Sequence, residues 1–303
     1  MSEVALHVRG LTRHFGRIAA VQDLSLEVLT GDVYGFLGPN GAGKTTAMRC
    51  ILGLIRKDAG DVTVLGETDI NIARRQVGAI IEVPSFHTWM TGRENLKQAA
   101  WLSTLGSATN SEIDRVLDRV GLAERAGDRA GTYSLGMKQR LGIARSLLGK
   151  PKILFLDEPT NGLDPSGMAE MRDLIRSLAL HDQITIFISS HLLGEVQAVC
   201  NRVGIIQSGT LRAEGNVKEL IREDDGKPVV EIGCNDHEAL KAALATIDGI
   251  EVTGPGAAGR VRAVYEGIEL ADLNIQLVQA GVRVDSLVPA QRNLEDVFLE
   301  VTG

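Results

Sequence analysis

A glycine-rich run near the N-terminus combines the residue types that bind phosphate groups. Its nine residues are Gly38, Pro39, Asn40, Gly41, Ala42, Gly43, Lys44, Thr45 and Thr46. The run matches GxxxxGK followed by Ser or Thr, a pattern whose glycines let backbone N–H groups turn toward phosphate oxygens. We expect Lys44 to reach the β and γ phosphates of a nucleotide and the Thr45 hydroxyl to bind Mg²⁺. The alternative, a glycine-rich turn that only caps a helix, is disfavoured by the strand-loop-helix context.

Two carboxylates, Asp157 and Glu158, end an apolar run that begins at Ile153, and Asp157 follows Lys44 by 113 residues. Ligands of open α/β sheets bind at the carboxyl ends of strands, so a strand that ends here would bring both carboxylates to the phosphate loop. We expect Asp157 to hold Mg²⁺, commonly through water, and Glu158 to polarise the attacking water. The alternative is an acidic turn after a strand. Together with the phosphate loop, the pair indicates nucleotide hydrolysis.

The elements that must position these residues alternate between β-rich runs and helical patterns, which predicts an α/β fold with a sheet flanked by helices. Leu24, Leu26 and Val28 alternate as a half-buried strand. Buried strands are predicted at 33–37, 152–156 and 185–189. The phosphate loop should lie between the first of these buried strands and a helix that runs to about Leu54.

The pattern from about residue 88 to 150 is helical, which predicts a small helical subdomain within this part of the chain. Thr91 and Glu94 have the spacing of a capping box before one helix. Ser111 is expected to cap another helix.

The charge is divided unequally along the chain. The 303 residues carry 32 Lys+Arg and 39 Asp+Glu, for a net charge of −7. Residues 222–303 alone sum to −8, which leaves +1 for the other 221. We therefore predict domains at 1–221 and 229–303, joined by a charged, solvated linker at 222–228. The acidic balance argues against a protein that coats nucleic acid, because counterion release needs a basic face.

The lengths of the apolar runs and the spacing of the cysteines exclude further classes of protein. No apolar run reaches the roughly 18 residues that span a bilayer, so membrane association would require a partner. Cys50, Cys200 and Cys234 are far apart and lack the spacing of metal ligands. This pattern predicts neither a disulfide framework nor a zinc site, and it favours a reducing cytosol.

The nine residues 133–141, YSLGMKQRL, resemble the signature motif of ATP-binding-cassette (ABC) ATPases. The resemblance implies that Ser134 and Gly136, at the start of a helix, contact the γ-phosphate of ATP bound by a facing subunit. A serine N-cap and free N–H groups would direct the positive end of a helix at an anion. Without the rest of the cassette, Ser134 would be read as a routine helix cap.

Further motifs of the family follow in order and extend the resemblance over residues 1 to about 221. Phe15 resembles the aromatic residue that stacks on adenine, although a lone Phe after a strand is more often a core residue. Asp164, in the run NGLD, resembles part of the loop that links two nucleotide sites across a dimer. His191 resembles the switch histidine that contacts the γ-phosphate. A lone His at a strand end is otherwise usually a surface residue.

The sequence departs from the family pattern at two places. The signature usually reads LSGGQ, whereas Leu135 and Met137 replace a Gly and the Gln here. The Gln that normally contacts Mg²⁺ and the attacking water aligns with Glu82. We expect Glu82 to be a catalytic residue and a metal ligand, because a carboxylate is also a hard oxygen ligand. The alternative is that Glu82 ends an edge strand in solvent.

Glu82, the SLGM form of the signature and the C-terminal run NLEDVFLE at 293–300 resemble one branch of the family, the bacterial ABC-2-type exporters. These include the ATPase subunits of bacitracin, lantibiotic and anthracycline efflux systems. The resemblance implies ATP and Mg²⁺ as cofactors and a homodimer that closes on two ATP molecules. It also implies that the chain lies at the cytoplasmic face of the membrane, attached to a separate multi-span permease through which a drug, antibiotic peptide or lipid-like molecule is exported. No nucleic acid partner is expected.

The run NLEDVFLE has a simpler explanation as well. Leu294, Val297, Phe298 and Val301 lie on one stripe of an amphipathic helix, so packing alone accounts for it.

The C-terminal residues predict a small α+β module of ferredoxin-like type. We expect strands at 228–232 and 260–265, and helices at about 236–247 and 269–280. Dimerisation, regulation and permease docking are equally open roles for this module.

Two rival functions remain at this point. A soluble ABC ATPase of cofactor assembly, or of another non-transport role, would share the cassette, although the appended module is unexpected for it. A P-loop GTPase or small-molecule kinase would share the phosphate loop. That rival is weaker, because the sequence has no NKxD segment for reading guanine and the signature would be unexplained.

Overall fold

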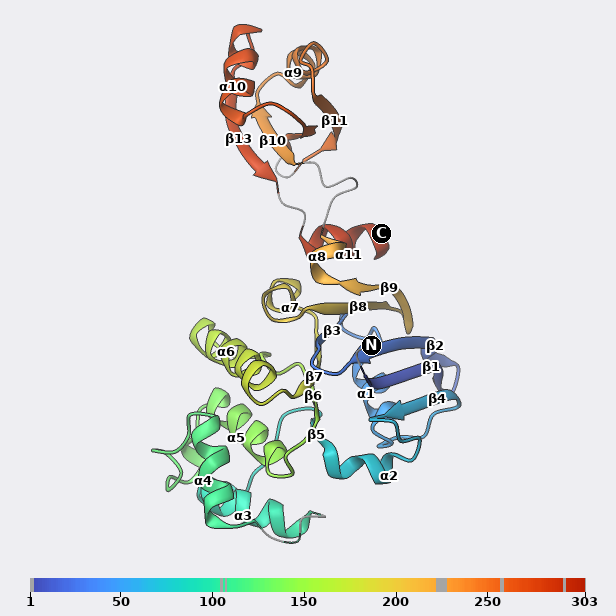
Figure 1. Ribbon diagram of the computed structural model, residues 1–303, viewed down its shortest axis with the longest axis vertical. Coiled ribbons are helices and arrows are strands. Elements are labelled where there is room, and N and C mark those ends of the chain that lie inside the picture. The colour runs from blue at the N-terminus through green and yellow to red at the C-terminus, as the bar shows by residue number, and fades with distance from the viewer. Residues whose placement is uncertain are drawn as a thin grey trace. The chain divides into compact units, whose positions relative to one another are not determined.

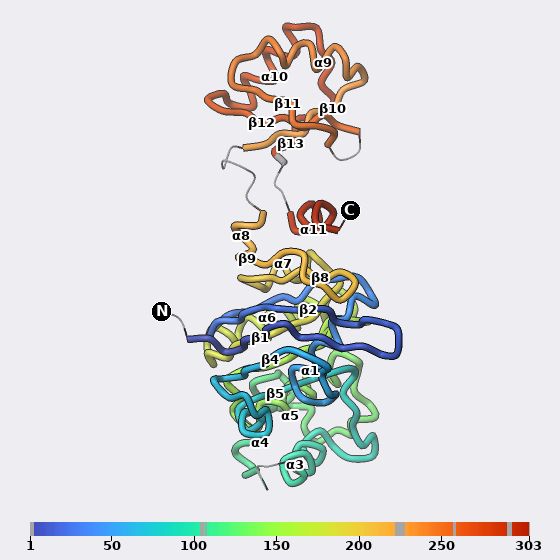
Figure 2. The backbone as a smooth tube through the Cα atoms, turned by 90° about the vertical axis from the view of Figure 1, so that its right-hand side faces the viewer, coloured from blue at the N-terminus to red at the C-terminus, as the bar shows by residue number. Residues whose placement is uncertain are grey.

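The computed structural model describes residues 3–103, 106, 108–221, 228–256, 259–290 and 293–302 (Figures 1 and 2). The described chain forms two compact units. The first unit is Met1–Val217 with Phe298–Gly303, and the second is Lys218–Val297. Of the predicted linker at 222–228, all but Pro228 lies outside the described residues, so the domain boundary stays a prediction.

The first unit is built on a six-stranded sheet in the order β5-β6-β7-β3-β8-β9. Its strands are β3 (Val33–Leu37), β5 (Val77–Ile80), β6 (Ile153–Asp157), β7 (Thr185–Ser190), β8 (Arg202–Gln207) and β9 (Thr210–Asn216). All pair in parallel except β8 with β9. The buried strands predicted at 33–37, 152–156 and 185–189 are confirmed. Every residue of β3, β6 and β7 is buried, as expected for parallel strands covered on both faces.

A three-stranded antiparallel sheet in the order β2-β1-β4 lies in the same unit. Its strands are β1 (Val4–Phe15), β2 (Ile18–Leu29) and β4 (Ala59–Val64). Leu24, Leu26 and Val28 are buried, which confirms the predicted alternation in β2. Helix α1 (Lys44–Ile51) shares one apolar core with both sheets. The helix ends before the expected Leu54, because Gly53 takes the left-handed conformation with φ of 63°.

In the described part of the chain, seven further helices lie between β4 and residue 221. They are α2 (Ile70–Ala73), α3 (Gly92–Leu102), α4 (Asn110–Arg119), α5 (Leu135–Leu147), α6 (Pro165–His181), α7 (Leu193–Val199) and α8 (Val217–Leu220), with 3₁₀ turns at Arg74–Gln76 and Ala130–Thr132. Helices α3, α4 and α5 pack together as the predicted helical region (Figure 1). Among the described residues, none of the helices combines the length and the apolar composition needed to cross a bilayer.

Both capping boxes in this helical region begin with threonine. Thr91 and Glu94 bond reciprocally at the start of α3, as predicted, and the backbone N–H of Thr91 lowers the pKa of the Glu94 carboxyl. The predicted cap at Ser111 is wrong. Thr109 caps α4, because Glu112 lies three residues later and completes the box, whereas Ser111 lies inside the first turn.

The second unit has the βαββαβ order of a ferredoxin-like fold, which confirms the prediction. Its elements are β10 (Val229–Cys234), α9 (His237–Leu244), β11 (Ile250–Pro255), β12 (Val261–Tyr265), α10 (Leu270–Gln279) and β13 (Val284–Ala290). They form a four-stranded antiparallel sheet in the order β11-β12-β10-β13. Strands β11 and β13 were not predicted, because Gly or Pro interrupts both and neither has a clear apolar alternation.

The last helix, α11 (Leu294–Thr302), confirms that the run NLEDVFLE is helical. Leu294 and Val297 are buried, whereas Leu299 is exposed. The helix is therefore amphipathic, as the packing explanation requires.

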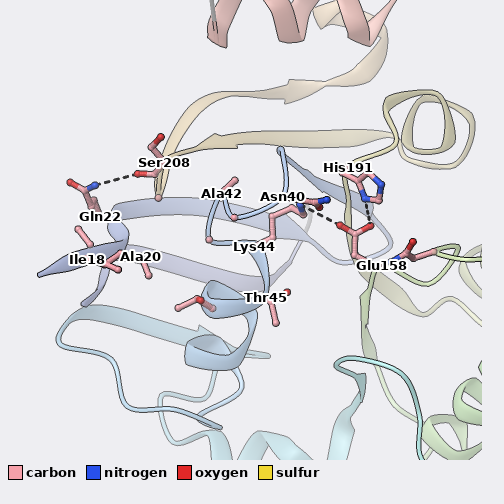
Figure 3. Close-up of a pocket in the computed structure, with 16 residues that line it drawn as sticks. Ile18, Ala20, Gln22, Asn40, Ala42, Lys44, Thr45, Glu158, His191 and Ser208 are labelled. Atoms are coloured by element: carbon pink, nitrogen blue, oxygen red, sulfur yellow. Dashed lines mark hydrogen bonds and ion pairs between the residues drawn. The ribbon is translucent and has the colours of Figure 1, made fainter. Parts of the chain in front are cut away.

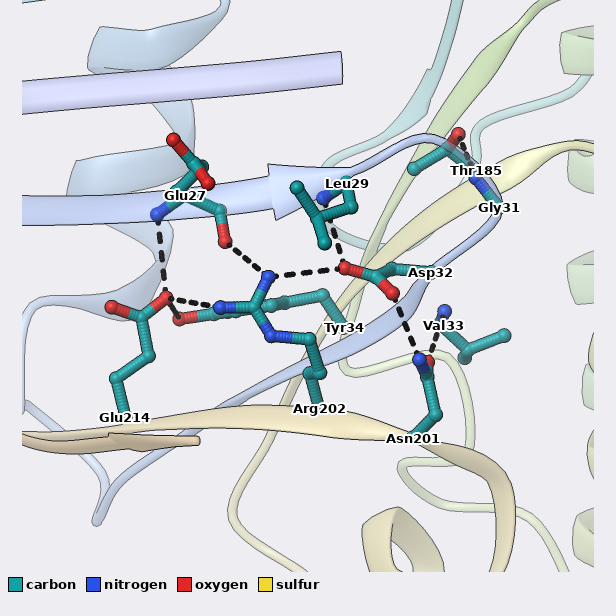
Figure 4. A network of polar contacts seen from close by, with 10 residues as sticks. All are labelled: Glu27, Leu29, Gly31, Asp32, Val33, Tyr34, Thr185, Asn201, Arg202 and Glu214. Atoms are coloured by element: carbon teal, nitrogen blue, oxygen red, sulfur yellow. Dashed lines mark hydrogen bonds and ion pairs between the residues drawn. The ribbon is translucent and has the colours of Figure 1, made fainter. Parts of the chain in front are cut away.

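A polar network at the amino end of β3 joins that strand to β8 and β9 (Figure 4). The Arg202 guanidinium contacts Asp32 at 3.3 Å and Glu214 at 3.6 Å. Asn201 donates to Asp32 at 2.8 Å, and the Tyr34 hydroxyl donates to Glu214 at 2.9 Å. Because Asp32 is buried, these partners are what make its charge tolerable. The network holds the start of the strand that leads to the phosphate loop.

Tyr34→Phe should destabilise the first unit by about 1–3 kcal/mol, because it removes a hydrogen bond to a charged acceptor in a buried site. Burial and the Glu214 carboxylate both raise the pKa of Tyr34, so the hydroxyl stays a donor over the physiological range. Calorimetric unfolding of the full chain would measure the loss. Tyr265→Phe is the control, since among the described residues no partner binds its hydroxyl. Equal effects of the two changes would show that the network adds nothing to stability.

Candidate nucleotide site

The glycine-rich run forms a loop between β3 and α1, as predicted. Gly41 and Gly43 have φ angles of 81° and 104°, a region that favours glycine. Gly43 is also closely covered, since a Cβ atom there would lie 2.3 Å from the carbonyl oxygen of Ala20. Helix α1 begins at Lys44, directly after this glycine. Its free N–H groups and positive end therefore lie at the loop, where an anion is stabilised.

A cavity of about 640 Å³ opens over this loop (Figure 3). The loop contributes the residues from Asn40 to Thr46. The other lining residues are Ile18, Ala19, Ala20, Gln22, Glu158, Asn161, His191, Ser208 and Gly209. The size is in the range of small-ligand sites, which suits a nucleotide. The residues from the β1–β2 and β8–β9 hairpins were not predicted, because residues of these types in hairpins carry no local signal of binding.

Lys44 is fixed at the centre of the site although it is 94% buried. Its ammonium donates to the carbonyl oxygens of Gly38 at 2.7 Å and Pro39 at 3.2 Å, and lies 3.3 Å from Glu158 Oε1. Gly38 and Pro39 thus contribute backbone oxygens to the lysine and do not line the cavity. The charge of Lys44 is held where phosphates would enter.

Glu158 links the lysine to the histidine (Figure 3). Its second carboxylate oxygen, Oε2, lies 2.8 Å from His191 Nδ1. Glu158 follows β6 in the left-handed conformation, with φ of 49°, and its backbone N–H donates to the Ser189 carbonyl at 3.1 Å. A non-glycine residue seldom adopts this conformation. Here it turns the carboxylate out of the strand direction and into the cavity.

Asp157 lies one residue earlier and is buried. Its Oδ2 accepts a hydrogen bond of 2.8 Å from the Thr45 hydroxyl, and its Oδ1 accepts one from Ser189. A hydroxyl and a carboxylate side by side at a phosphate loop are hard oxygen donors of the kind that Mg²⁺ prefers. The residues therefore fit the metal. Ser189 was not predicted, and its signal was a polar residue within a buried strand.

The signature residues lie outside the lining of this cavity. Ser134 caps α5 by accepting a hydrogen bond of 3.2 Å from the Met137 N–H. Asp164 caps α6 by accepting one of 3.1 Å from the Gly167 N–H. A Cβ atom on Gly136 would lie 3.7 Å from a side-chain carbon of Leu163, so the two motifs are neighbours. Within one chain, the side chains of Ser134 and Asp164 therefore act as helix caps.

Phe15 and Glu82 also lie outside the lining of the cavity. Phe15 is 47% exposed, and the Arg13 guanidinium lies 4.6 Å from the centre of its ring. Phe15 is thus no core residue. Glu82 follows the edge strand β5, its side chain is 65% exposed, and it forms an ion pair with Arg49 of α1. Its predicted role in metal binding stays a prediction.

Fold and site together define a P-loop nucleoside triphosphatase of the ATP-binding-cassette class. The family model described as "ABC transporter" matches residues 21–161. The bacitracin transport ATP-binding protein BcrA of Bacillus licheniformis is 40% identical over 97% of this chain and 95% of its own length. The Nod factor export ATP-binding protein I of a Rhizobium species is 35% identical over 100% of this chain and 98% of its own.

A solved structure supports the same assignment. The cbiO1 protein of Clostridium perfringens, part of the ABC transporter complex cbiONQ, superposes with a TM-score of 0.67 at 26% identity. The match covers 74% of this chain and 92% of that one. The chain belongs to the family of ABC transporter ATP-binding proteins. It is an ATPase, and the GTPase and kinase alternatives are excluded.

Gly43→Ala should weaken ATP binding by about tenfold or more, because the added methyl group meets the Ala20 carbonyl and the loop must move. Titration with a fluorescent ATP analogue would measure the loss. Gly66→Ala is the matched control. Gly66 also has a positive φ, of 80°, but a Cβ there would meet no atom within 4 Å. Unchanged affinity in Gly43→Ala would mean that the close approach does not shape the loop.

Proposed function

We propose that this chain is the ATP-hydrolysing subunit that powers export of a substrate through a separate transmembrane permease. The observation that carries the proposal is the meeting of Lys44, Glu158 and His191 in one cavity beside the pair of Thr45 and Asp157. Two relatives similar over nearly the whole chain are named for bacitracin transport and Nod factor export. They support a drug, an antibiotic peptide or a lipid-like molecule as the exported class.

Each residue of the cavity has its own role in ATP hydrolysis. Lys44 neutralises the β and γ phosphates, and Thr45 and Asp157 would hold Mg²⁺, which supplies further positive charge at these phosphates. Glu158 polarises the attacking water. His191 holds the Glu158 carboxylate through its Nδ1 atom and contacts the γ-phosphate. Each role places a charge or a hydrogen bond where negative charge develops, which is how phosphoryl transfer is accelerated.

A second copy of the chain would complete the site. Ser134 and Gly136 lie outside the cavity of their own chain, so they are available to ATP bound by a facing subunit. Two copies packed head to tail would bury two ATP molecules, with Asp164 in the loop between the sites. Binding then favours the closed dimer, and loss of the γ-phosphate contacts reopens it. The permease would take up this motion at the cytoplasmic face of the membrane.

Glu158→Gln should accumulate an ATP-bound dimer, because the amide cannot polarise water while the phosphate contacts remain. Light scattering after size-exclusion chromatography in ATP and Mg²⁺ would measure the mass. Glu124→Gln, at an exposed position outside the cavity, is the control and should turn over ATP normally. A monomeric Glu158→Gln variant in saturating ATP would remove either Glu158 from its role or the dimer from the mechanism.

Glu82→Ala should shift the Mg²⁺ concentration needed for half-maximal ATPase upward and weaken stimulation by the permease, if the carboxylate leaves Arg49 for the metal. Steady-state ATPase assays across a Mg²⁺ series, with and without permease, would measure both effects. Glu124→Ala controls for the loss of an exposed carboxylate. If the Glu82→Ala and Glu124→Ala variants match the parent protein, Glu82 only ends the edge strand.

Co-purification in mild detergent tests the partner directly. A tagged full chain expressed in its own host should bring down a polytopic membrane protein, identified by mass spectrometry. The Glu158→Gln variant in ATP should retain that partner in the closed state. Recovery of soluble partners alone would favour the rival, a soluble ABC ATPase of cofactor assembly or another non-transport role.

A further inference from the structure

A separate cavity of about 370 Å³ lies at the amino ends of β6 and β7. The nucleotide cavity lies at the carboxyl ends of the same strands, so the two are about 15 Å apart along the sheet. Four basic side chains reach the separate cavity: Arg115 and Arg119 from α4, and Lys150 and Lys152 from the α5–β6 loop. These four residues are called the basic cluster below.

The basic cluster carries a large excess of positive charge. Asp182 is the acidic residue that lines the cavity, which leaves a formal charge of +3 among the lining residues of a chain with a net charge of −7. Asp182 is already engaged, because its Oδ2 lies 2.6 Å from Arg119 Nε. Glu112 attracts both Lys150 and Arg115 from nearby, but its carboxylate accepts hydrogen bonds from the N–H and hydroxyl of Thr109.

The two arginines are held in place before any ligand binds. Arg119 Nη2 donates to the Ser177 hydroxyl at 2.9 Å, and Arg115 Nη2 donates to the Leu147 carbonyl at 3.3 Å. The lysines differ, since no acceptor for either ammonium group is found among the described residues. Held guanidinium groups lose little side-chain entropy on binding, and the ammonium groups remain free to donate.

Repulsion within the basic cluster favours an anionic ligand. Arg115 and Arg119 are four residues apart on α4, where like charges repel. The cavity floor includes Leu147 and Ile184, whose apolar side chains reduce dielectric screening. A bound anion would offset this repulsion.

We infer that the basic cluster binds a phosphate group that is separate from the nucleotide. A carboxylate is satisfied by one arginine, whereas a phosphate group presents several acceptor oxygens and at least one negative charge, which suits several basic side chains with an excess of +3. The cavity is at the lower end of the range for small ligands. It suits a free diphosphate or the headgroup of an anionic phospholipid, which share this chemistry.

Inorganic pyrophosphate is the first probe. All binding measurements use chains that also carry Lys44→Ala, since loss of Lys44 should disable the nucleotide site and leave only the basic cluster to bind the probe. Lys150→Gln/Lys152→Gln in this background should weaken pyrophosphate binding by about tenfold or more in calorimetric titration, because two charge-assisted contacts are lost. Arg75→Gln/Lys97→Gln is the charge-matched control, at exposed positions outside the cavity. Arg115→Gln is a second variant should the double change disturb folding. In chains that keep Lys44, basal ATPase activity should be unchanged by the double variant, its control and Arg115→Gln.

Vesicle sedimentation separates the two sources of the phosphate group. Binding to phosphatidylglycerol vesicles and not to phosphatidylcholine vesicles, lost in Lys150→Gln/Lys152→Gln and kept in the control, would identify a lipid headgroup. Pyrophosphate binding without vesicle binding would identify a soluble phosphate ligand. Equal binding by the double variant and its control in both assays, or binding in neither assay, would overturn the inference.

Discussion

The parallel register of β3, β6 and β7 is the constraint on which the nucleotide site depends. Leu37 pairs with Ser190, and Asp157 pairs with Ser189. The phosphate loop, the two carboxylates and His191 therefore leave the sheet at one edge. A slip of one residue in β6 would turn Asp157 to the other face of the sheet and break its hydrogen bond with Thr45. Strand pairing between distant segments thus sets the spacing of the chemical groups.

The polar network around Arg202 secures the opposite end of β3. A buried ion pair is weak evidence of net stability, because desolvation opposes the Coulomb attraction. Its geometric effect is clearer, since Asp32 is bound by both Asn201 and Arg202 from the start of β8. With its amino end held in this way, β3 delivers the phosphate loop from a fixed position. The turns that follow β3 and β6 both contain residues with positive φ, Gly43 and Glu158, and only in Glu158 is this conformation strained.

The distribution of charged residues along the chain matters more to its function than the net charge. Residues 222–303 sum to −8 and the other 221 residues to +1, so the negative net charge of −7 comes from the C-terminal part of the chain. Within this near-neutral part, Lys44 faces the carboxyl ends of the strands while the basic cluster lies at their amino ends. A protein without general affinity for polyanions can therefore hold positive charge at two confined places. Lys44 is buried, so solvent screens its charge less than the charges of the exposed Lys150 and Lys152.

The sequence by itself determined the features that depend on neighbours along the chain. The phosphate loop, the capping box at Thr91, and the helices and two of the strands of the ferredoxin-like unit are of this kind, because their signals are local patterns of residue type. Even there, Thr109 and not Ser111 caps α4, since the reciprocal bond to Glu112 decides between two good caps. The tertiary structure decided which distant groups meet. The hairpin residues at the nucleotide cavity, the pairing of Glu82 with Arg49 and the basic cluster join segments without a shared pattern, so only packing of the folded chain could bring them together.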